Sequence, residues 1–305
     1  MSDWKEALNK LNCGEVRWEE PLAKHTTFRI GGPCEAMVLP QTVEQAAVLL
    51  EYARQLTVPV CVLGGGSNIL ADDAGLRGLV IKLGGQLKEL KIDGCCLQAE
   101  AGLPLPVLAR RAADAGLAGL AFAAGIPGTV GGAVVMNAGA HGGQISDIIE
   151  SVTYSDEKGH LVTIPAAEAG FVYRSSLFKT KPKWTILSVA CRLQPGDEQA
   201  IKAQMAAYQA ERVHKQPQGL PSAGSVFKNP QGDAAGRLIE AIGAKGWRVG
   251  DAQVSEVHSN FIVNLGQATC ADVLALVRRI QKTVWQHFEV KLEREIILLS
   301  ELVQK

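Results

Sequence analysis

The sequence predicts an α+β fold with more than one domain, and three of its features support this. Segments with the apolar repeat of helices are interspersed with short apolar runs typical of strands, without the strict alternation of a βαβ protein. At 305 residues the chain is longer than one hydrophobic core usually serves. Hydrophobic residues make up 47% and charged residues 20%, which is the composition of an ordinary soluble globular protein.

Helices are predicted where apolar residues repeat on one face behind a capping signal. Thr42 begins one such helix because Gln45 follows three residues later, and Thr269 with Asp272 begins another. Asp233 is expected to cap a third helix. The expected helices lie within residues 1–20, from 42 to about 53, after Pro104, from about 198 to 214, from 233 to 242, and from 269 to about 288.

Strands are predicted from short apolar runs bounded by glycine, proline or polar turns. They are expected at residues 24–33, 58–63, 79–83, 95–101, 147–155, 160–164, 184–193, 261–265 and 291–299. The fifth and sixth form a hairpin around Lys158-Gly159. Pro195-Gly196-Asp197 closes this region, so we expect a domain boundary there, with units at 1–20, 21–196 (two subdomains, split near 85–100) and 197–305.

Charge and cysteine usage exclude several classes of function. The formal net charge is +0, which provides no broad attraction to nucleic acid or to an anionic membrane. Met1–Glu6 is polar, so no secretory signal is expected. The seven cysteines contain no Cys-x-x-Cys pair and no zinc-like histidine spacing, which favours buried free thiols in a reducing cytoplasm and no metal site.

Two glycine-rich segments are the first signs of a ligand. Gly64-Gly65-Gly66-Ser67-Asn68 follows an apolar strand and can form an anion nest, although it lacks the Rossmann pattern and alone fits a plain loop equally well. Residues 115–146 contain no Asp, Glu, Lys or Arg, yet their many glycines would break a membrane helix. Gly125–Ala133 within this stretch is either close strand packing or a second set of backbone donors. Together the segments favour a diphosphate held by neutral N–H groups.

The loop Pro221–Pro230 places a hydroxyl, an ammonium and a carboxamide within five residues, at Ser225, Lys228 and Asn229. Its prolines and Gly224 predict a rigid loop. Its serine can serve as a turn former, as an N-cap or as a group that transfers a proton.

Five motifs in order resemble those of the bacterial UDP-N-acetylenolpyruvoylglucosamine reductase (MurB) family. They are Thr27-Phe28-Arg29-Ile30-Gly31-Gly32, Gly64–Asn68, Pro127-Gly128-Thr129-Val130-Gly131-Gly132, Tyr173-Arg174-Ser175-Ser176 and Gly224–Pro230, followed by a closing Leu-Glu-x-Glu. Two positions depart from the family pattern: Arg294 stands where a proline is usual, and His141 where an aromatic residue is common.

The resemblance implies an FAD-binding module of the vanillyl-alcohol-oxidase (PCMH) type over residues 21–196, with noncovalent FAD, followed by an α+β substrate domain. It implies NADPH-dependent reduction of the enolpyruvyl ether of UDP-N-acetylglucosamine in peptidoglycan precursor synthesis. About 60 residues separate Asn229 from the expected last strand, which resembles the shorter type II subfamily. A monomer in the cytoplasm is expected, without nucleic acid or membrane partners.

The resemblance also implies roles for individual residues. Hydride from flavin N5 would reach the terminal enolpyruvyl carbon, and Ser225 would protonate the adjacent carbon. Arg174 would bind the substrate carboxylate and Glu295 would assist it as a buried acid. Glu293 and Glu295 share one side of an extended strand, so spacing alone leaves both open. The implied FAD contacts are Arg29, Ile30, Gly31, Gly64, Gly65, Gly66, Ser67, Asn68, Pro127, Gly128, Thr129, Gly131, Gly132 and Ala133. The candidate substrate contacts are Tyr173, Lys215, Lys228 and Asn229.

Two other functions remain open at this point. An oxidase or dehydrogenase of an alcohol or sugar on the same flavin fold would explain both glycine segments. It would not explain why Arg174, Ser225 and Glu295 occur in this order along the chain. A nucleotide-binding module without catalysis would be colourless and would fail to take up FAD.

Overall fold

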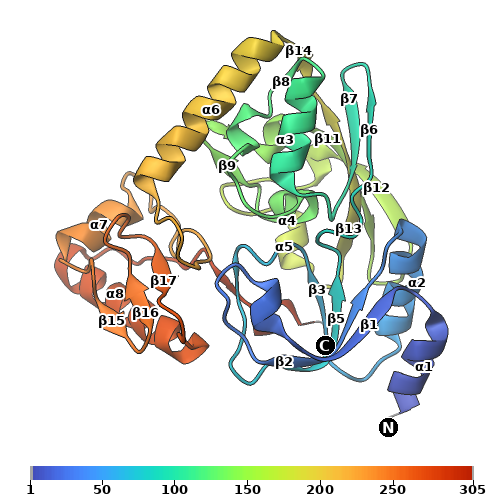
Figure 1. Ribbon diagram of the computed structural model, residues 1–305, viewed down its shortest axis with the longest axis horizontal. Helices are drawn as coiled ribbons and strands as arrows, with labels where there is room; N and C mark the ends of the chain where they lie inside the picture. Colours follow the sequence, from blue (N-terminus) through green and yellow to red (C-terminus); the bar gives the residue numbers. More distant parts are fainter. Residues whose placement is uncertain (1–2, 304–305) are drawn as a thin grey trace.

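The computed structural model describes residues 3–303 and shows a mixed α+β protein with three main sheets (Figure 1). The first sheet has the order β1-β2-β5-β3, the second β12-β11-β13-β7-β6 and the third β15-β16-β17. The α+β prediction is therefore confirmed. Within the described residues, no helix combines the length and the apolar character needed to cross a membrane.

The first sheet combines parallel and antiparallel strands. β5 pairs in parallel with both β2 and β3, and β1 pairs antiparallel with β2. Helices α1 and α2 lie beside this sheet in Figure 1. The bounds of these elements are α1 Asp3–Leu11, β1 Glu15–Pro21, β2 Pro33–Leu39, α2 Val43–Arg54, β3 Val60–Leu63, β4 Ile69–Leu70 and β5 Leu76–Lys82, with a 3₁₀ turn at Leu22–His25.

The second sheet is antiparallel throughout and packs against α3, α4 and the charge-free glycine-rich stretch. Its core contains the fully buried Val152 and Cys191. The bounds are β6 Leu90–Asp93, β7 Cys96–Glu100, α3 Leu105–Asp114, β8 Leu117–Ala118, α4 Val130–Val135, β9 Gly139–Ala140, β10 Gly143–Gln144, β11 Ile149–Ser155, β12 Leu161–Pro165, α5 Leu177–Thr180, β13 Thr185–Arg192 and β14 Gln194–Pro195. Further 3₁₀ turns span Ala121–Ala123, Ile145–Asp147 and Ala166–Glu168.

The long helix α6 leads to a smaller lobe around the third sheet (Figure 1). Asp197 caps α6 by accepting a hydrogen bond from the Ala200 N–H. Thr269 and Asp272 stand at the start of α8 as expected, and in the structure they form a capping box. The bounds are α6 Glu198–Lys215, α7 Ala235–Ala241, β15 Arg248–Val249, β16 Ala252–Val254, β17 Ile262–Asn264, α8 Cys270–Phe288 and β18 Ile297–Leu298, with a final 3₁₀ turn at Leu299–Leu302.

Three predictions of local structure were wrong. Residues 24–33 were expected as a strand, but Arg29 and Gly31 have φ of 56° and 133°, and this left-handed backbone cannot continue a ladder. Residues 291–299 were expected as one strand, but β18 covers only two of them. Asp233 was expected to cap α7, but the residue at the N-cap position is Ala234. The Asp233 carboxylate accepts a hydrogen bond from the Ala234 N–H and not from an N–H of the first helical turn.

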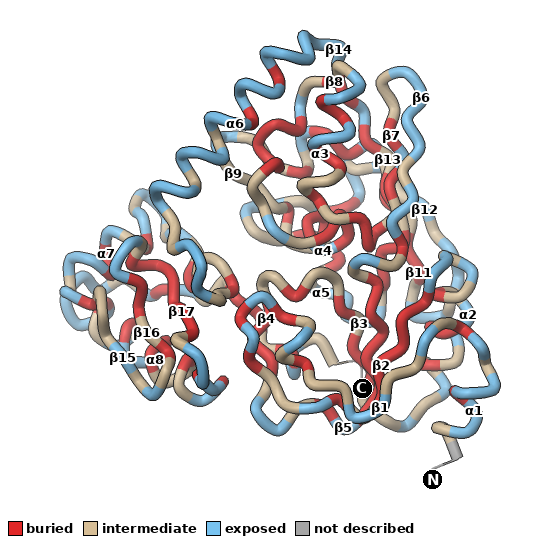
Figure 2. The backbone as a smooth tube through the Cα atoms, viewed as in Figure 1, coloured by how far each residue is buried: buried red, intermediate tan, exposed pale blue. Residues whose placement is uncertain are grey.

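Buried residues form separate cores on both sides of the first sheet, in the second sheet and in the smaller lobe (Figure 2). The segment between β1 and β2 connects two of these regions. Phe28 and Ile30 are almost fully buried and pack with Val226 and Phe227 of the smaller lobe. The Thr27 hydroxyl also donates a hydrogen bond to the Ser222 carbonyl at 2.7 Å. These contacts hold the smaller lobe beside the first sheet.

Candidate functional site

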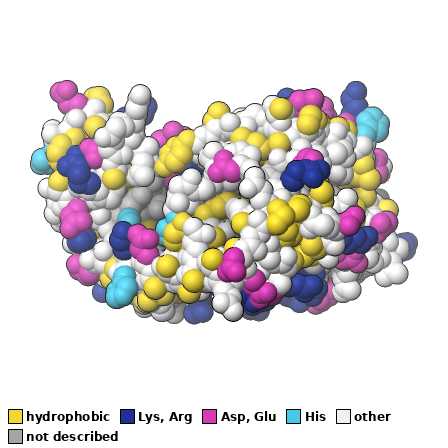
Figure 3. Space-filling model, turned by 90° about the horizontal axis from the view of Figure 1, so that it is seen from above, with side chains coloured by type: hydrophobic (Ala, Val, Ile, Leu, Met, Phe, Trp, Pro, Cys, Tyr) yellow, Lys and Arg dark blue, Asp and Glu magenta, His cyan; other side chains and the backbone are white. Residues whose placement is uncertain are grey.

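A cavity of about 460 Å³ lies where the two larger sheets and the smaller lobe meet, a volume in the range of ligand sites. Its walls come from both glycine segments, from Arg174 on the second sheet's side, and from Ser225 and Glu295 of the smaller lobe and C-terminal segment. Figure 3 shows a notch between the smaller lobe and the larger body, with charges of both signs mixed on this face. The sequence-predicted residues in the lining are Gly64, Gly65, Gly66, Ser67, Asn68, Pro127, Gly128, Thr129, Gly131, Gly132, Ala133, Arg174, Ser225 and Glu295.

The loop after β3 presents unpaired backbone donors to this cavity. Within residues 3–303, the N–H groups of Gly65, Gly66 and Ser67 donate no hydrogen bond to the protein. Glycine is required here by close packing, since a Cβ on Gly65 would lie 2.9 Å from the Gly128 Cα and one on Gly66 would lie 2.1 Å from a carbonyl oxygen. Three adjacent free N–H groups form the nest that an anion occupies.

The second glycine segment closes against the first. The Ser67 hydroxyl donates to the Pro127 carbonyl at 3.0 Å, and a Cβ on Gly64 would meet the Thr129 hydroxyl oxygen at 2.7 Å. Thr129 caps α4 by accepting a hydrogen bond from the Gly132 N–H. Both segments are neutral, so their donors suit a diphosphate group, and the residues present fit the one in FAD.

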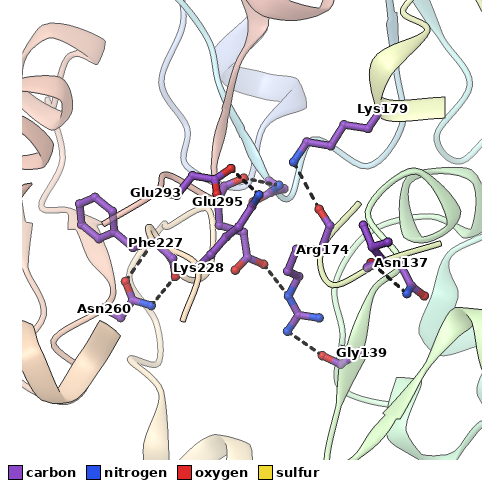
Figure 4. A network of polar contacts seen from close by, with 11 residues as sticks. Asn137, Gly139, Arg174, Lys179, Phe227, Lys228, Asn260, Glu293 and Glu295 are labelled. Atoms are coloured by element: carbon purple, nitrogen blue, oxygen red, sulfur yellow. Dashed lines mark hydrogen bonds and ion pairs between the residues drawn. The ribbon is translucent and has the colours of Figure 1, made fainter. Parts of the chain in front are cut away.

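Arg174 and Glu295 both line the cavity, and their side chains point toward each other and form an ion pair (Figure 4). The Arg174 Nε lies 2.9 Å from the Glu295 carboxylate, and its Nη2 donates to the Gly139 carbonyl at 3.0 Å. The Nε contact is an ion pair of poor hydrogen-bond angle, so this buried N–H has no aligned acceptor within residues 3–303. Arg174 has a φ of 54°, in the left-handed region that costs energy for a side chain of this size. The guanidinium therefore keeps hydrogen-bonding capacity for another carboxylate.

The structure distinguishes the two glutamates that spacing leaves equivalent. The side chain of Glu293 is 70% exposed and pairs with Lys228, whereas that of Glu295 is 16% exposed. Burial raises the pKa of Glu295, although Arg174 and the nearby lysines act in the opposite direction. Glu295 therefore keeps a proton to higher pH than an ordinary glutamate.

Ser225 lies on a short extended segment that forms an isolated bridge with Phe261. It lines the main cavity and also a second cavity of about 440 Å³, which Asn229, Arg237 and His258 line as well. Its hydroxyl forms no hydrogen bond within the described part of the chain. The hydroxyl is therefore available to a molecule bound between the two cavities.

Seven of the predicted contacts do not line the main cavity. Ile30 is buried in the core of the smaller lobe and Gly31 packs against Ala71, while Arg29 is exposed. The other four are substrate candidates placed near or outside the rim. Tyr173 is 51% exposed with the Arg174 guanidinium over its ring, Lys215 pairs with Glu211, Lys228 pairs with Glu293, and the Asn229 side chain accepts from the Ala235 N–H at 3.0 Å.

Two cations in the cavity wall were not predicted from the sequence. Lys179 of α5 donates to the Arg174 carbonyl at 3.3 Å, which helps hold the left-handed backbone there. Arg212 of α6 lines the cavity beside Gly125, and burial lowers the pKa of its guanidinium. Both lie on helical segments whose sequence does not distinguish them from the solvent-exposed lysines and arginines of any helix. Only the packing of these helices in the structure shows that the two side chains line the cavity.

Comparison with known proteins identifies the family. The sequence-family model of the FAD binding domain matches residues 34–165. The family model of the UDP-N-acetylenolpyruvoylglucosamine reductase C-terminal domain matches residues 216–299. The chain is 45% identical over 298 residues to UDP-N-acetylenolpyruvoylglucosamine reductase 2 of Symbiobacterium thermophilum, covering 97% of this chain and 96% of that protein. The chain belongs to the UDP-N-acetylenolpyruvoylglucosamine reductase (MurB) family.

Further members of this family agree in sequence and in fold. The reductase of Agathobacter rectalis is 46% identical over 295 residues, which is 93% of each chain. The crystal structure of MurB from Thermus caldophilus superimposes with a TM-score of 0.79 at 40% identity, over 93% of this chain and 98% of that one. The FAD-binding module followed by a MurB C-terminal domain, expected from the sequence, is thereby confirmed.

Proposed function

We propose that the chain is an NADPH-dependent flavoenzyme that reduces the enolpyruvyl ether of UDP-N-acetylglucosamine to UDP-N-acetylmuramate. This is a step of peptidoglycan precursor synthesis, and the activity follows from membership of the MurB family. The observation that carries the proposal to individual residues is the ion pair of Arg174 and Glu295 in one cavity with Ser225 and the glycine loops.

The glycine loops would hold the cofactor. The free N–H groups of Gly65, Gly66 and Ser67 would bind the FAD diphosphate, while Gly128 and Thr129 support them from the opposite side. When bound, the flavin takes up hydride from NADPH and supplies it to the substrate. The backbone donors would orient the cofactor without adding charge, because both segments are neutral.

Arg174 and Glu295 would bind the carboxylate of the enolpyruvyl group. Addition of hydride to the terminal carbon sends negative charge toward this carboxylate, so groups that stabilise the charge lower the barrier. Arg174 never deprotonates and can offer parallel N–H groups. Glu295, with its raised pKa, can remain protonated and donate a hydrogen bond in place of competing with the carboxylate for Arg174.

Ser225 would deliver the proton that completes the reduction. A serine hydroxyl is a weak acid, but the carbon next to the carboxyl group becomes strongly basic once the hydride has arrived. The hydroxyl lines the cavity and is free of hydrogen bonds to residues 3–303, so it can face that carbon. Solvent would then return the proton to the serine oxygen.

Several finer points belong to this proposal. Residues 21–196 would act as the FAD module and residues 197–305 as the substrate unit, with the chain in the type II subfamily. The second cavity, with Asn229 in its wall, would take the nucleotide part of the substrate. Tyr173, Lys215 and Lys228 line neither cavity, and in this proposal they would contact the parts of the substrate that extend beyond the cavities. We further propose a monomer working in the cytoplasm, where NADPH and nucleotide sugars are available.

A direct assay tests the proposed function. The purified protein should be yellow, release FAD on denaturation, and oxidise NADPH catalytically only when the enolpyruvyl nucleotide is present. The expected product is the lactyl ether, formed in a one-to-one ratio with NADP⁺. Rapid NADPH oxidation that depends on oxygen and ignores the nucleotide would refute the proposal in favour of an oxidase.

A further inference from the structure

Lys82 is a buried cation that the reaction described above does not use. It is the last residue of β5 and is 8% exposed. Its ammonium group donates to the Gly64 carbonyl at 2.6 Å, and no carboxylate within residues 3–303 pairs with it. Buried lysines are rare and are normally paired with an acid, because an unpaired charge is costly to remove from water. A neutral carbonyl is weak compensation for such a charge.

Strand register places this charge directly behind the first glycine loop. β5 and β3 run parallel, and Lys82 is the register partner of Leu63, the residue before Gly64. The neighbouring Gly84 leaves the space around the carbonyl open, since a Cβ there would lie 2.3 Å from the Gly64 oxygen. The Gly64 carbonyl is therefore drawn toward Lys82 and is occupied as an acceptor.

This arrangement prepares the next three residues for an anion. With its carbonyl bonded to Lys82, the peptide after Gly64 is held in one orientation, and the free N–H groups of Gly65, Gly66 and Ser67 follow it in the cavity wall. The ammonium charge lies on the far side of the same loop. Its field adds to that of the N–H dipoles wherever an anion sits in the nest.

We propose that Lys82 is a positioning residue for the FAD diphosphate, which fixes the Gly64–Ser67 loop and supplies a buried positive charge behind it. The proposal rests on the proposed function only in taking FAD as the ligand. Lys82 would touch neither the flavin ring nor the substrate. Its effect would therefore appear in cofactor affinity and not in the rate of the loaded enzyme.

Protonation of Lys82 provides an independent way to detect this role. Burial lowers the pKa of Lys82 to about 8, and the titratable groups facing it are His25 and, through a 2.9 Å contact with His25, Glu20. A bound diphosphate favours the charged lysine and so raises its pKa. By linkage, FAD affinity is highest at a pH below the pKa of Lys82 in the FAD-free protein, which is about 8. The affinity declines as pH rises above that value and Lys82 loses its charge.

The experiment measures FAD dissociation constants of deflavinated full-length protein by flavin fluorescence, from pH 6.5 to 9.5, for wild type, Lys82→Met and Lys82→Gln. We expect both variants to bind FAD at least about tenfold more weakly than wild type at pH 7, and to lose the wild-type decline above pH 8. Lys91→Met, on the exposed strand β6, is the matched control and should behave as wild type.

Stability separates this role from a structural one. Removing an uncompensated buried charge should leave the unfolding midpoint of apo Lys82→Met equal to that of wild type or higher, while FAD affinity falls. A structural lysine would lower the midpoint along with the affinity. If Lys82→Met does not fold, Lys82→Gln and the wild-type pH titration decide the question.

FAD affinity within twofold of wild type in the folded variants, or an unchanged pH dependence in Lys82→Gln, would overturn the inference while leaving the proposed function intact. Failure of the wild-type protein itself to bind FAD would instead contradict the proposed function.

Discussion

The two sides of the cavity are built from different kinds of groups. On the proposed cofactor side, the unpaired backbone N–H groups belong to the Gly64–Ser67 loop, and the cation Lys82 is buried behind this loop. On the substrate side, the wall carries ionisable or polar side chains, namely Arg174, Glu295 and Ser225. In the proposed function the cofactor remains on the protein and only has to be held in place, so fixed dipoles are sufficient for it. The substrate must exchange protons and leave, which requires side chains that titrate or donate.

The largest effect is expected when the proton donor on the substrate side is removed. Ser225→Ala should lower kcat by about 10²–10⁴-fold, the usual contribution of a general acid. Reduction of the bound flavin by NADPH should remain near the wild-type rate, because no group on the cofactor side has changed. Stopped-flow absorbance separates the two half-reactions.

Ser222→Ala, in the same loop, is the matched control and should preserve both half-reactions. Steady-state turnover of Ser225→Ala within a few-fold of wild type would remove Ser225 from the mechanism and assign the proton to another group.

A smaller effect is expected from the acid that faces Arg174. Since burial raises the pKa of Glu295, turnover should fall as pH increases above the usual glutamate range and the carboxyl group loses its proton. Glu295→Gln keeps a neutral hydrogen-bond donor that does not titrate. Turnover of this variant should therefore no longer fall with rising pH in this range, while kcat drops by roughly 10–100-fold. The measurement is a pH profile of kcat and of kcat/KM.

Glu293→Gln is a close comparison, because Glu293 lies only two residues before Glu295 in the chain. Because its carboxylate is 70% exposed, the change should shift stability by less than about 1 kcal/mol and leave the pH profile as in wild type. If the fall of turnover with rising pH disappeared in Glu293→Gln and persisted in Glu295→Gln, the roles that we propose for the two glutamates would be exchanged.

The smallest effect on turnover, and a clear one on affinity, is expected on the cofactor side. Gly65→Ala would place its Cβ 2.9 Å from the Gly128 backbone, so the two loops must separate, and FAD affinity should fall about tenfold or more. The variant saturated with FAD should still turn over substrate. FAD affinity equal to that of wild type in Gly65→Ala would show that the close approach of the loops does not hold the cofactor.

Some elements could be predicted from the sequence because their signals are local. The capping box at Thr269 and the apolar stripe behind it predict α8, and the hairpin of β11 and β12 follows from its turn. The segment 24–33 could not be predicted in the same way. Its apolar residues, Phe28 and Ile30, satisfy a strand pattern, but they are buried against the distant smaller lobe through a left-handed turn.

The sequence by itself determined the kinds of groups in the site and their order along the chain: neutral glycine donors first, then an arginine, a serine and a closing pair of glutamates. Only the tertiary structure decided which of them act together. It buries Glu295 against Arg174 and leaves Glu293 in solvent, and it places Lys82, hidden in an apolar strand, behind the Gly64 carbonyl. The physical reason is that burial and charge pairing depend on how separate segments pack together, whether they are 18 residues apart, as Gly64 and Lys82 are, or more than a hundred, as Arg174 and Glu295 are. No local sequence pattern encodes this packing.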